Sequence, residues 1–406
     1  MTFRDDVREY FERESRRLPA PAGLRADVTA GALERPRPTS TVRWAAVLAA
    51  LLAVAIVAGL LASSELRKVL NPPVVPGHVH VGAGQTQIFL DVSPIDGLHA
   101  YALIVLCGAD YITNCQAWVE STADGGRTWG GAVKVGPTFR GSDADTIRHI
   151  HFATVADGFV YGLGVAYVTH NAGRTWSQAP SDFSNLVWIA GATAVWELVD
   201  PCPAGTVCPI GVRMSVDGGR TWSTAAALPG GLEPQEIVPF GASGLLLGSP
   251  GKGDMAITTD GGRTWRSIGG RCSSDSPGNS VATSDGREIW QVCGTQSLGV
   301  FVSTDGGVHW TAHQNPGVGN LVGPILISPV PGTALLTTST TTAGVISDLL
   351  VSRDGGASWQ LIPAARGFWP PEFTQAGVAW SVDLHGYVWI STDDGLTWVK
   401  RSQPSP

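Results

Sequence analysis

Charged residues, joined in two cases by aromatic residues, occur in four segments of the chain, residues 138–149, 228–236, 269–279 and 364–373. Acids, arginines and aromatic rings together can bind a peptide or a glycan, because they combine directional hydrogen bonds with a large apolar contact. The candidate ligand-binding residues in these segments are Arg140, Asp143, Asp145, Arg148, Glu236, Arg271, Arg366 and Trp369. The same segments also offer Glu233, Phe368 and Glu372. For each single residue, an ordinary solvated loop position is the alternative.

The sequence carries none of the common catalytic signatures. It has no GxSxG elbow, no P-loop and no HExxH motif. A metal centre is not expected either, because no CxxC pair occurs and the nine His residues are scattered. We therefore expect neither a cofactor nor a bound metal.

The elements that must position these residues are indicated by one short pattern that recurs seven times. The copies TADGGRTW, THNAGRTW, SVDGGRTW, TTDGGRTW, STDGGVHW, SRDGGASW and STDDGLTW end at Trp129, Trp176, Trp222, Trp265, Trp310, Trp359 and Trp398. Their third position holds Asp124, Asn171, Asp217, Asp260, Asp305, Asp354 and Asp393. Successive copies are about 45 residues apart, which is the size of a four-stranded propeller blade.

Each repeated position has a mechanical role in a tight hairpin. The third-position Asp can accept hydrogen bonds from backbone N–H groups of its own turn. The fifth-position Gly, present in all seven copies, can adopt a positive φ without a Cβ penalty. The terminal Trp can fold over the turn and bury an aromatic face against the blade. The pattern therefore predicts one stapled hairpin per blade.

These copies resemble the Asp-box, also called the bacterial neuraminidase repeat, of sialidases, sortilin-type ectodomains and propellers of the photosystem II assembly-factor type. The resemblance covers residues 87–402, with Asn171 in place of Asp in the second copy and His309 or Ser358 in place of Thr in two others. It implies that each copy joins the third and fourth strands of a blade, on the side away from the usual binding face. It implies a fold and not a catalytic activity.

The strand pattern agrees with one copy per blade. Residues 87–402 divide into seven units of about 45 residues with four apolar or alternating segments each. The first unit, for example, reads QIFLDVS, AYALIVLC, CQAWVEST and TWGGAVKV. The sequence therefore predicts an all-β fold, a seven-bladed β-propeller of four-stranded blades over residues 87–406, preceded by one transmembrane helix. Ring closure needs no exchanged strand, although residues 79–81 could supply one.

The six Cys residues lie in three pairs that are close in sequence, and local pairing is the simplest hypothesis. These pairs are Cys107 with Cys115, Cys202 with Cys208, and Cys272 with Cys293. In the blade assignment, the first two pairs close loops between second and third strands. The third pair ties a connection between blades to the end of a second strand. All three bridges would stiffen the face opposite the repeated turns, which also carries the candidate ligand-binding segments.

Residues 44–64 contain no charged side chain and are long enough, at about 1.5 Å per residue, to cross a bilayer as a helix. Four Arg residues lie within 25–43, whereas only Arg67 and Lys68 follow the span closely. This bias predicts a single-pass cell-membrane protein with a cytoplasmic N-terminus. All Cys residues follow the span, as an oxidising extracytoplasmic compartment would favour. A cleaved signal peptide and a buried core helix are the alternatives, and residues 65–86 read as a Pro/Gly linker.

Residues 1–43 form an Arg-rich segment with nine Arg against seven Asp and Glu. Residues 19–43 are rich in Pro, Ala and Arg, and we expect them to be disordered. Within residues 3–18, a narrow apolar stripe predicts an amphipathic helix that either docks a cytoplasmic partner or lies on a surface. The stripe comprises Phe3, Val7, Tyr10, Phe11 and Leu18.

The charge balance argues against nucleic acid as the partner of the main domain. The formal net charge is −7, and the part after the span offers no basic stripe to neutralise phosphates. The sequence favours a membrane-anchored, non-enzymatic module that binds a protein or glycan outside the cytoplasm. One alternative is a sialidase-like glycosidase, which needs an Arg cluster and a Tyr nucleophile paired with Glu. The other is a transmembrane sensor that uses residues 3–18 for docking.

Overall fold

The structure is a computed structural model that describes most of the chain after residue 84. The described residues are 85–110, 113–141, 147–162, 165–179, 186–191, 194–199, 210–230, 232–234, 236–248, 254–272, 280–294, 298–317, 324–340, 346–374, 376–383 and 385–404. The predicted cytoplasmic segment, the predicted span and the linker up to residue 84 lie outside them. Within the described ranges, no helix has the length and apolar character needed to span a bilayer.

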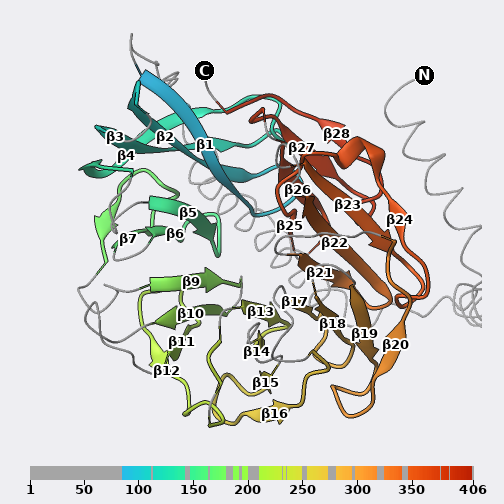
Figure 1. The fold of residues 1–406 in the computed structure, drawn as a ribbon. Coiled ribbons are helices and arrows are strands. Elements are labelled where there is room, and N and C mark those ends of the chain that lie inside the picture. Colours follow the sequence, from blue (N-terminus) through green and yellow to red (C-terminus); the bar gives the residue numbers. More distant parts are fainter. Residues whose placement is uncertain are drawn as a thin grey trace, which may run out of the picture. The chain divides into compact units, whose positions relative to one another are not determined.

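The described strands form seven four-stranded antiparallel sheets, each built from four consecutive strands (Figure 1). We number these sheets blade 1 to blade 7 in chain order. Blade 1 comprises β1 (Gln85–Pro94), β2 (Ala100–Gly108), β3 (Cys115–Thr122) and β4 (Gly130–Phe139). Blade 2 comprises β5 (Ile147–Phe152), β6 (Gly158–Gly162), β7 (Val165–Thr169) and β8 (Ser177–Gln178). Blade 3 comprises β9 (Leu186–Ala190), β10 (Val195–Val199), β11 (Gly211–Ser215) and β12 (Ser223–Thr224).

The remaining four blades repeat the same order. Blade 4 comprises β13 (Glu236–Phe240), β14 (Gly244–Gly248), β15 (Met255–Thr258) and β16 (Arg266–Ile268). Blade 5 comprises β17 (Ser280–Ala282), β18 (Ile289–Cys293), β19 (Gly299–Ser303) and β20 (Thr311–His313). Blade 6 comprises β21 (Ile325–Val330), β22 (Thr333–Thr340), β23 (Ile346–Ser352) and β24 (Gln360–Leu361). Blade 7 follows a short 3-10 helix, η2 (Pro363–Ala365), and comprises β25 (Glu372–Phe373), β26 (Ala379–Val382), β27 (Val388–Ser391) and β28 (Val399–Lys400).

The hydrophobic core lies between neighbouring blades. Seven apolar clusters of described residues coincide with the seven contacts from blade 1–2 round to blade 7–1. Each cluster also receives the terminal Trp of the repeated pattern from the second blade of its pair. In the last cluster, Trp129 of blade 1 packs with Trp380 and Val382 of blade 7, so the ring is closed. The seven-bladed propeller predicted from the repeats is confirmed.

Polar side chains on the innermost strands also join neighbouring blades. Asp91 of β1 accepts a hydrogen bond from the backbone N–H of Ile150 in β5, and Ser93 accepts one from Phe152. On the other side of the ring, Glu236 of β13 accepts from the N–H of Val281 in β17. Burial of a polar group is tolerable when it is hydrogen-bonded in this way. These side chains therefore accept hydrogen bonds from backbone N–H groups on the innermost strand of the next blade, where no further strand pairs with those groups.

The ring closes without an exchanged strand among the described residues, as predicted. Blades 1 and 7 each contain four strands that are consecutive in sequence. The C-terminal tail instead bridges the two blades, because Ser402 donates from its backbone N–H to Gly126 O (3.0 Å) and from its hydroxyl to Arg127 O (2.8 Å). Trp380 of blade 7 also donates to the carbonyl of Asp96 in blade 1.

The repeated residues form a tightly hydrogen-bonded turn between the third and fourth strand of each blade. We call these the tryptophan-capped turns: residues 122–129, 169–176, 215–222, 258–265, 303–310, 352–359 and 391–398. In the third, Ser215 Oγ donates to Asp217 Oδ1 (2.8 Å) and accepts from the N–H of Gly219 (2.8 Å). Asp217 in turn accepts from the backbone N–H and the hydroxyl of Thr221 (2.8 and 2.6 Å). The first-position Ser or Thr was not foreseen as a partner, although it is present in all seven copies.

The three departures from the pattern, Asn171, His309 and Ser358, keep equivalent contacts, and Ser358 donates from its N–H and hydroxyl to Asp354. Asn171 accepts from the N–H of Thr175 and donates its amide to the Thr175 hydroxyl. His309 places Nδ1 2.6 Å from Asp305 Oδ2, where the other turns have a hydroxyl. Where the third residue is Asp, these bonds favour the ionised form; the Thr264 hydroxyl and N–H lower the pKa of Asp260 to about 2.

The fifth-position Gly is required both by backbone conformation and by close packing. It has positive φ in all seven turns, for example +86° at Gly219. A Cβ at Gly219 would lie 2.3 Å from the ring of Phe159 in the preceding blade. The fourth position also has positive φ throughout, even where it is Ala172 (+62°) or Asp394 (+57°). The fourth-position requirement was not predicted.

Candidate functional site

The strand order separates two faces of the propeller. The tryptophan-capped turns and the links from first to second strands lie at one end of the blades, which we call the turn side. The links between blades and from second to third strands lie at the other end, because neighbouring strands are antiparallel. We call that end the opposite face. The described parts of the four segments with candidate ligand-binding residues belong to it, as predicted.

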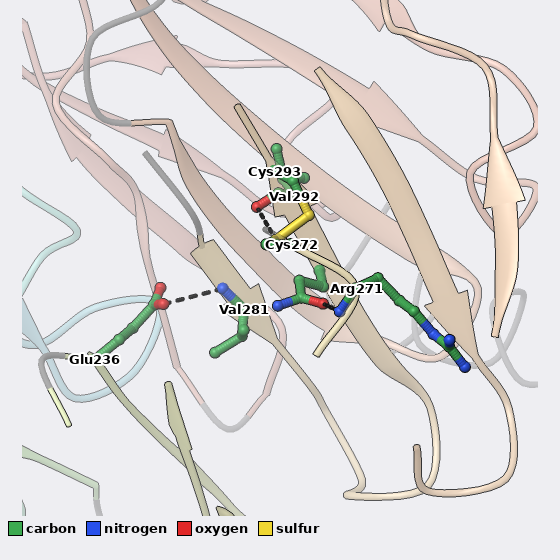
Figure 2. The surroundings of a disulfide bond; sticks show 7 residues. Glu236, Arg271, Cys272, Val281, Val292 and Cys293 are labelled. Carbon is green, nitrogen blue, oxygen red and sulfur yellow. Dashed lines mark hydrogen bonds between the residues drawn. A yellow bond between two sulfur atoms is a disulfide. The ribbon is translucent and has the colours of Figure 1, made fainter. Parts of the chain in front are cut away.

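Two of the three predicted disulfides stiffen the opposite face. Cys107 at the end of β2 is bonded to Cys115 at the start of β3. Cys272, in the link from blade 4 to blade 5, is bonded to Cys293 at the end of β18 (Figure 2). Both pairings and their places in the blades are confirmed. Cys202 and Cys208 lie outside the described residues.

The predicted ligand-binding residues occupy different positions on this face. Asp143 and Asp145 lie outside the described residues. Arg140, Arg271 and Glu233 are exposed and come from three different links between blades, whereas the exposed Arg148 lies near the start of β5. In Figure 2 the Arg271 side chain extends away from the disulfide, while its backbone N–H donates to Gln291 Oε1 (2.7 Å).

Glu236 is a half-buried member of the innermost strand of blade 4 and not a surface loop residue. Its carboxylate accepts from Ser280 Oγ (2.7 Å) and from the N–H of Val281 (3.0 Å). Ser280 Oγ in turn accepts from the N–H of Leu326 in β21 (2.9 Å), so one polar chain joins blades 4, 5 and 6. Burial raises the pKa of Glu236 to about 7. The prediction of a ligand-binding role stays untested, and the contacts give Glu236 a structural one.

Trp369 is the most prominent candidate on the opposite face. Its residue is 57% exposed, and it is the one aromatic among the large apolar side chains that are exposed within the described ranges. The backbone around it is fixed, because Trp369 N donates to Val382 O (2.8 Å) and Ser381 Oγ donates to Trp369 O (2.7 Å). Phe368 is only 2% exposed and packs between blades 6 and 7, so the expectation of an exposed Phe368 is wrong. Successive side chains of an extended segment point to opposite sides, which directs Trp369 away from that contact.

Arg366 lies beside Trp369 in sequence and leans toward blade 6. Its side chain is 66% exposed, and Nε is 3.5 Å from Asp348 Oδ1 in β23. Within blade 6, the registers place Ile325 opposite Thr337 and Asp348 opposite Thr338, so these residues lie at nearly the same height. Ile325 is 41% exposed. At this end of blades 6 and 7, the structure thus exposes Trp369 and Ile325 and pairs Arg366 with Asp348.

A second polar cluster, which the sequence did not reveal, lies on the innermost strands of blades 7, 1 and 2. His149 Nδ1 is 3.6 Å from Asp91 Oδ2, and the His149 ring is 5.3 Å from that of Tyr161. Burial, reinforced by the charge of Asp91, raises the pKa of Glu372 well above its usual range. The register shifts next to Asp91 and His149 in their strands, where bulges reorient side chains. The alternating pattern of IRHIHF in β5 was the available signal.

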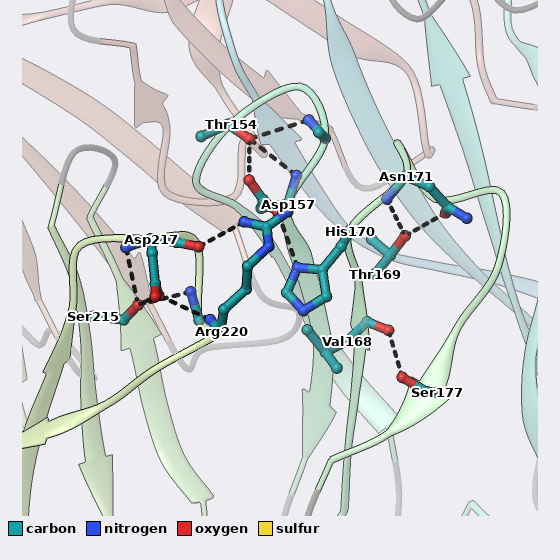
Figure 3. Close-up of polar contacts among 12 residues, drawn as sticks. Thr154, Asp157, Val168, Thr169, His170, Asn171, Ser177, Ser215, Asp217 and Arg220 are labelled. Atoms are coloured by element: carbon teal, nitrogen blue, oxygen red, sulfur yellow. Dashed lines mark hydrogen bonds and ion pairs between the residues drawn. The ribbon is translucent and has the colours of Figure 1, made fainter.

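The Arg residues of the repeated pattern lie on the turn side, as predicted. Arg220 Nη2 is 2.7 Å from Asp157 Oδ1, and the same oxygen is 2.9 Å from His170 Nδ1 (Figure 3). Asp157 and His170 belong to blade 2, where Asp157 lies in the link between β5 and β6. Arg220 belongs to blade 3, so this network ties the two blades together. Arg127 donates to the carbonyl of Asp124 within its own turn. These arginines are therefore separated from the exposed Trp369 by the height of the blades.

Comparison with solved structures identifies the class of fold. YCF48 from Cyanidioschyzon merolae aligns with a TM-score of 0.50 and 13% identity, covering 74% of this chain and 94% of that chain. YCF48 bound to D1 peptide gives a TM-score of 0.45 and 18% identity over 64% of this chain and 82% of that one. The GH74 enzyme of Niastella koreensis aligns with a TM-score of 0.43 and 13% identity, covering 78% of this chain and 66% of that chain.

At these identities the likeness shows the fold alone. No protein-family model matches the sequence, and the search of curated proteins found no match either. The chain therefore contains a seven-bladed β-propeller of four-stranded blades, with a fold similar to that of YCF48.

Proposed function

We propose that this chain is a non-enzymatic propeller that binds a partner protein through the face opposite the tryptophan-capped turns. The observation that carries this proposal is the exposure of Trp369 on a backbone that is hydrogen-bonded on both sides. A large aromatic surface held in place loses little entropy on binding. Trp and Arg are also the residue types most enriched at the energetic centres of protein interfaces. Trp369 and Arg366 are then the anchors, and Ile325 extends the apolar contact.

A protein partner is favoured over a glycan by the surroundings of Trp369. On the opposite face, the neighbouring blade 6 exposes Ile325 and carries Asp348, which is paired with Arg366. Exposed aliphatic side chains on this face suit a protein surface, whereas a sugar hydroxyl needs hydrogen-bond partners. The other predicted residues of the opposite face, Arg140, Asp143, Asp145, Arg148 and Arg271, would form the polar rim.

The proposal includes a membrane anchor and an extracytoplasmic domain. It rests on the apolar run of residues 44–64 and on the position of every Cys after it. The two disulfides of the described residues suit an oxidising compartment. Protease added to intact cells should then remove the C-terminal domain, and full protection of that domain would contradict the assignment.

We also infer that the tryptophan-capped turns are Asp-boxes in the sense of the sequence resemblance. Their hydrogen-bonding role between third and fourth strands supports this inference. In this account the turns hold the blades together and take no part in binding the partner.

A sialidase-like hydrolase has less support. Burial raises the pKa of Tyr101 to about 12, and it also raises the pKa of Tyr161 well above its usual value, which is the reverse of what a nucleophile needs. The four arginines of the repeated pattern lie on the turn side. A fluorogenic sialoside assay on the full-length chain tests this alternative, and turnover that is lost in Arg366→Ala or Arg271→Ala would establish it.

The direct test of partner binding is cross-linking of the intact protein followed by affinity capture. Trp369→Ala should lose a specific partner that the unchanged chain captures. Leu361→Ala is a matched control, because Leu361 is 47% exposed on the outer strand of blade 6. Loss of the partner in both variants, or in neither, would overturn the assignment of the binding face.

A further inference from the structure

Glu372 lies on β25, the shortest innermost strand among the described blades. β25 comprises two residues, whereas β1 comprises ten and β5 six. Pro370 and Pro371 precede it and have no backbone N–H to donate, so regular pairing with β26 is interrupted there. β25 is therefore bound to its own blade by two residue pairs, and it is the innermost strand that is most easily displaced.

Trp369 and Glu372 belong to one short segment, with the two Pro residues between them. Each Pro ring fixes the backbone φ, so this stretch is stiff. Trp369 itself is attached to the end of the second strand of blade 7, because its N–H donates to Val382 O (2.8 Å) and its carbonyl accepts from Ser381 Oγ (2.7 Å). A displacement of β25 is therefore transmitted to Trp369 and is not absorbed by the residues between them.

The surroundings of Glu372 disfavour its ionised form. β25 packs against β26 of its own blade, whose residues carry no titratable side chain, and against β1 of blade 1 (Figure 1), which carries Asp91. Burial and the negative charge of Asp91 raise the pKa of Glu372 well above its usual range. Both acids also act on Tyr161 of blade 2, whose pKa is raised mainly by burial. The neutral carboxyl of Glu372 is therefore the form that fits between blades 7 and 1.

Two His residues complete this cluster but bear on other blades. His149 Nδ1 lies 3.6 Å from Asp91 Oδ2, and a protonated His149 would offset part of the Asp91 charge. His151 Nε2 lies 2.6 Å from Gly191 O in blade 3, and burial lowers the pKa of His151. The neutral form of His151 is favoured, so its contribution to stability is lost as pH falls and not as pH rises. Glu372 is the member of the cluster that acts on β25, and its contribution falls as pH rises.

We propose that partner binding through Trp369 is controlled by protonation of Glu372. The neutral carboxyl keeps β25 against β1 and Trp369 in its binding position, which we call the closed arrangement. Ionisation of Glu372 next to Asp91 releases β25 toward solvent, and the two Pro residues carry Trp369 with it. This inference rests on the proposed protein-binding function and names the regulation of the same site.

The closed arrangement binds the Glu372 proton more tightly than the released one, in which the carboxyl has its ordinary pKa of about 4.3. The advantage of the closed arrangement is fully present below about pH 4.3 and is lost as pH rises through the raised pKa. Partner binding should therefore weaken as pH rises over that range.

The test is amide hydrogen exchange of the full-length chain without a partner, followed across this pH range and corrected for the intrinsic pH dependence of exchange. Protection of the Trp369 amide should fall by up to about tenfold for each pH unit over which the advantage is lost. Glu372→Gln, which is neutral at every pH, should keep this amide protected throughout. Asp91→Asn should reduce the fall, because the charge is removed while the amide oxygen can still accept from the N–H of Ile150.

Glu236→Gln is a matched control, because Glu236 is also a half-buried acid with a raised pKa on an innermost strand, but it lies in blade 4. It should leave the pH dependence at Trp369 unchanged. Constant protection of Trp369 in the unchanged chain, or the same pH dependence in Glu372→Gln, would overturn the inference. If cross-linked partner capture then still depends on Trp369, and to the same extent at low and high pH, the proposed function stands and only its control by Glu372 fails.

Discussion

The two faces of this propeller differ in how far the blades resemble one another. On the turn side, seven copies of one short sequence make the same hydrogen bonds, and each sends a Trp into the contact with the preceding blade. On the opposite face, the blades end at different heights and carry different side chains. Identical residues suit contacts that are repeated around the ring, whereas a specific binding surface requires side chains that differ from blade to blade. The repeated hydrogen bonds give the turns a structural role, and the proposed function places recognition on the opposite face.

The largest expected effect is on the turn side, in Gly219→Ala. This variant forces Ala to φ +86° and places its Cβ against Phe159. We expect the free energy of unfolding to fall by about 3 kcal/mol or more, from strain and overpacking together. Urea unfolding followed by Trp fluorescence measures it.

Two control glycines separate these causes. Gly241 also has positive φ but nothing within 4 Å of an added Cβ, so Gly241→Ala should cost about 1 kcal/mol. Gly230 has neither feature, and its replacement should be nearly neutral. Equal losses in all three variants would show that the close approach to the preceding blade is unimportant.

The disulfide Cys272–Cys293 should have the next largest effect, on the opposite face. It closes a sequence separation of 21 residues. Replacing both Cys residues by Ser should lower the free energy of unfolding by about 3 kcal/mol, since the unfolded chain regains the entropy of that loop. The same unfolding assay applies. An unchanged stability would mean that the link from blade 4 to blade 5 is held by other contacts.

Glu236 and the turn carboxylates should give pH dependences of opposite sign. The folded pKa of Glu236, about 7, lies above its unfolded value of about 4.3, so the folded state binds this proton more tightly. Stability should therefore fall as pH rises from about 4.3 to 7. Glu236→Gln should remove that fall, and an unchanged profile between these pH values would contradict the assignment.

Asp260 should show a smaller effect in the other direction. Its folded pKa of about 2 lies below the unfolded value of about 3.9, so its contribution is present above pH 3.9 and is lost as pH falls toward 2. Asp260→Asn should flatten this part of the profile while the turn persists, because Asn171 makes the equivalent contacts in blade 2. Thermal unfolding between pH 2 and 5 measures it. A steeper loss in the variant would be inconsistent with this account.

The fold was predictable because the repeated pattern marks the same place in every blade. The strand segments of blade 1, two disulfides and the closure by consecutive strands followed from it. The location of each Trp in the contact between two blades could not be predicted, because the pattern describes a hairpin and carries no information about the neighbouring blade.

The sequence indicated which face carries the candidate residues, but it did not show which of them lie together on that face. Trp369 and Arg366 stand in one segment, so their proximity was visible in the sequence, but their neighbours Asp348 and Ile325 come from other strands. Burial of Phe368 and the inward position of Glu236 depend on packing of adjacent blades. Residue type alone could not show which candidate residues are exposed and which are buried.

The most direct test is a hydrogen–deuterium exchange footprint of the full-length chain with and without its cross-linked partner. We predict protection of residues 366–369, with no change in the seven tryptophan-capped turns. Protection confined to the turn side, with residues 366–369 unaffected, would contradict the assignment of recognition to the opposite face.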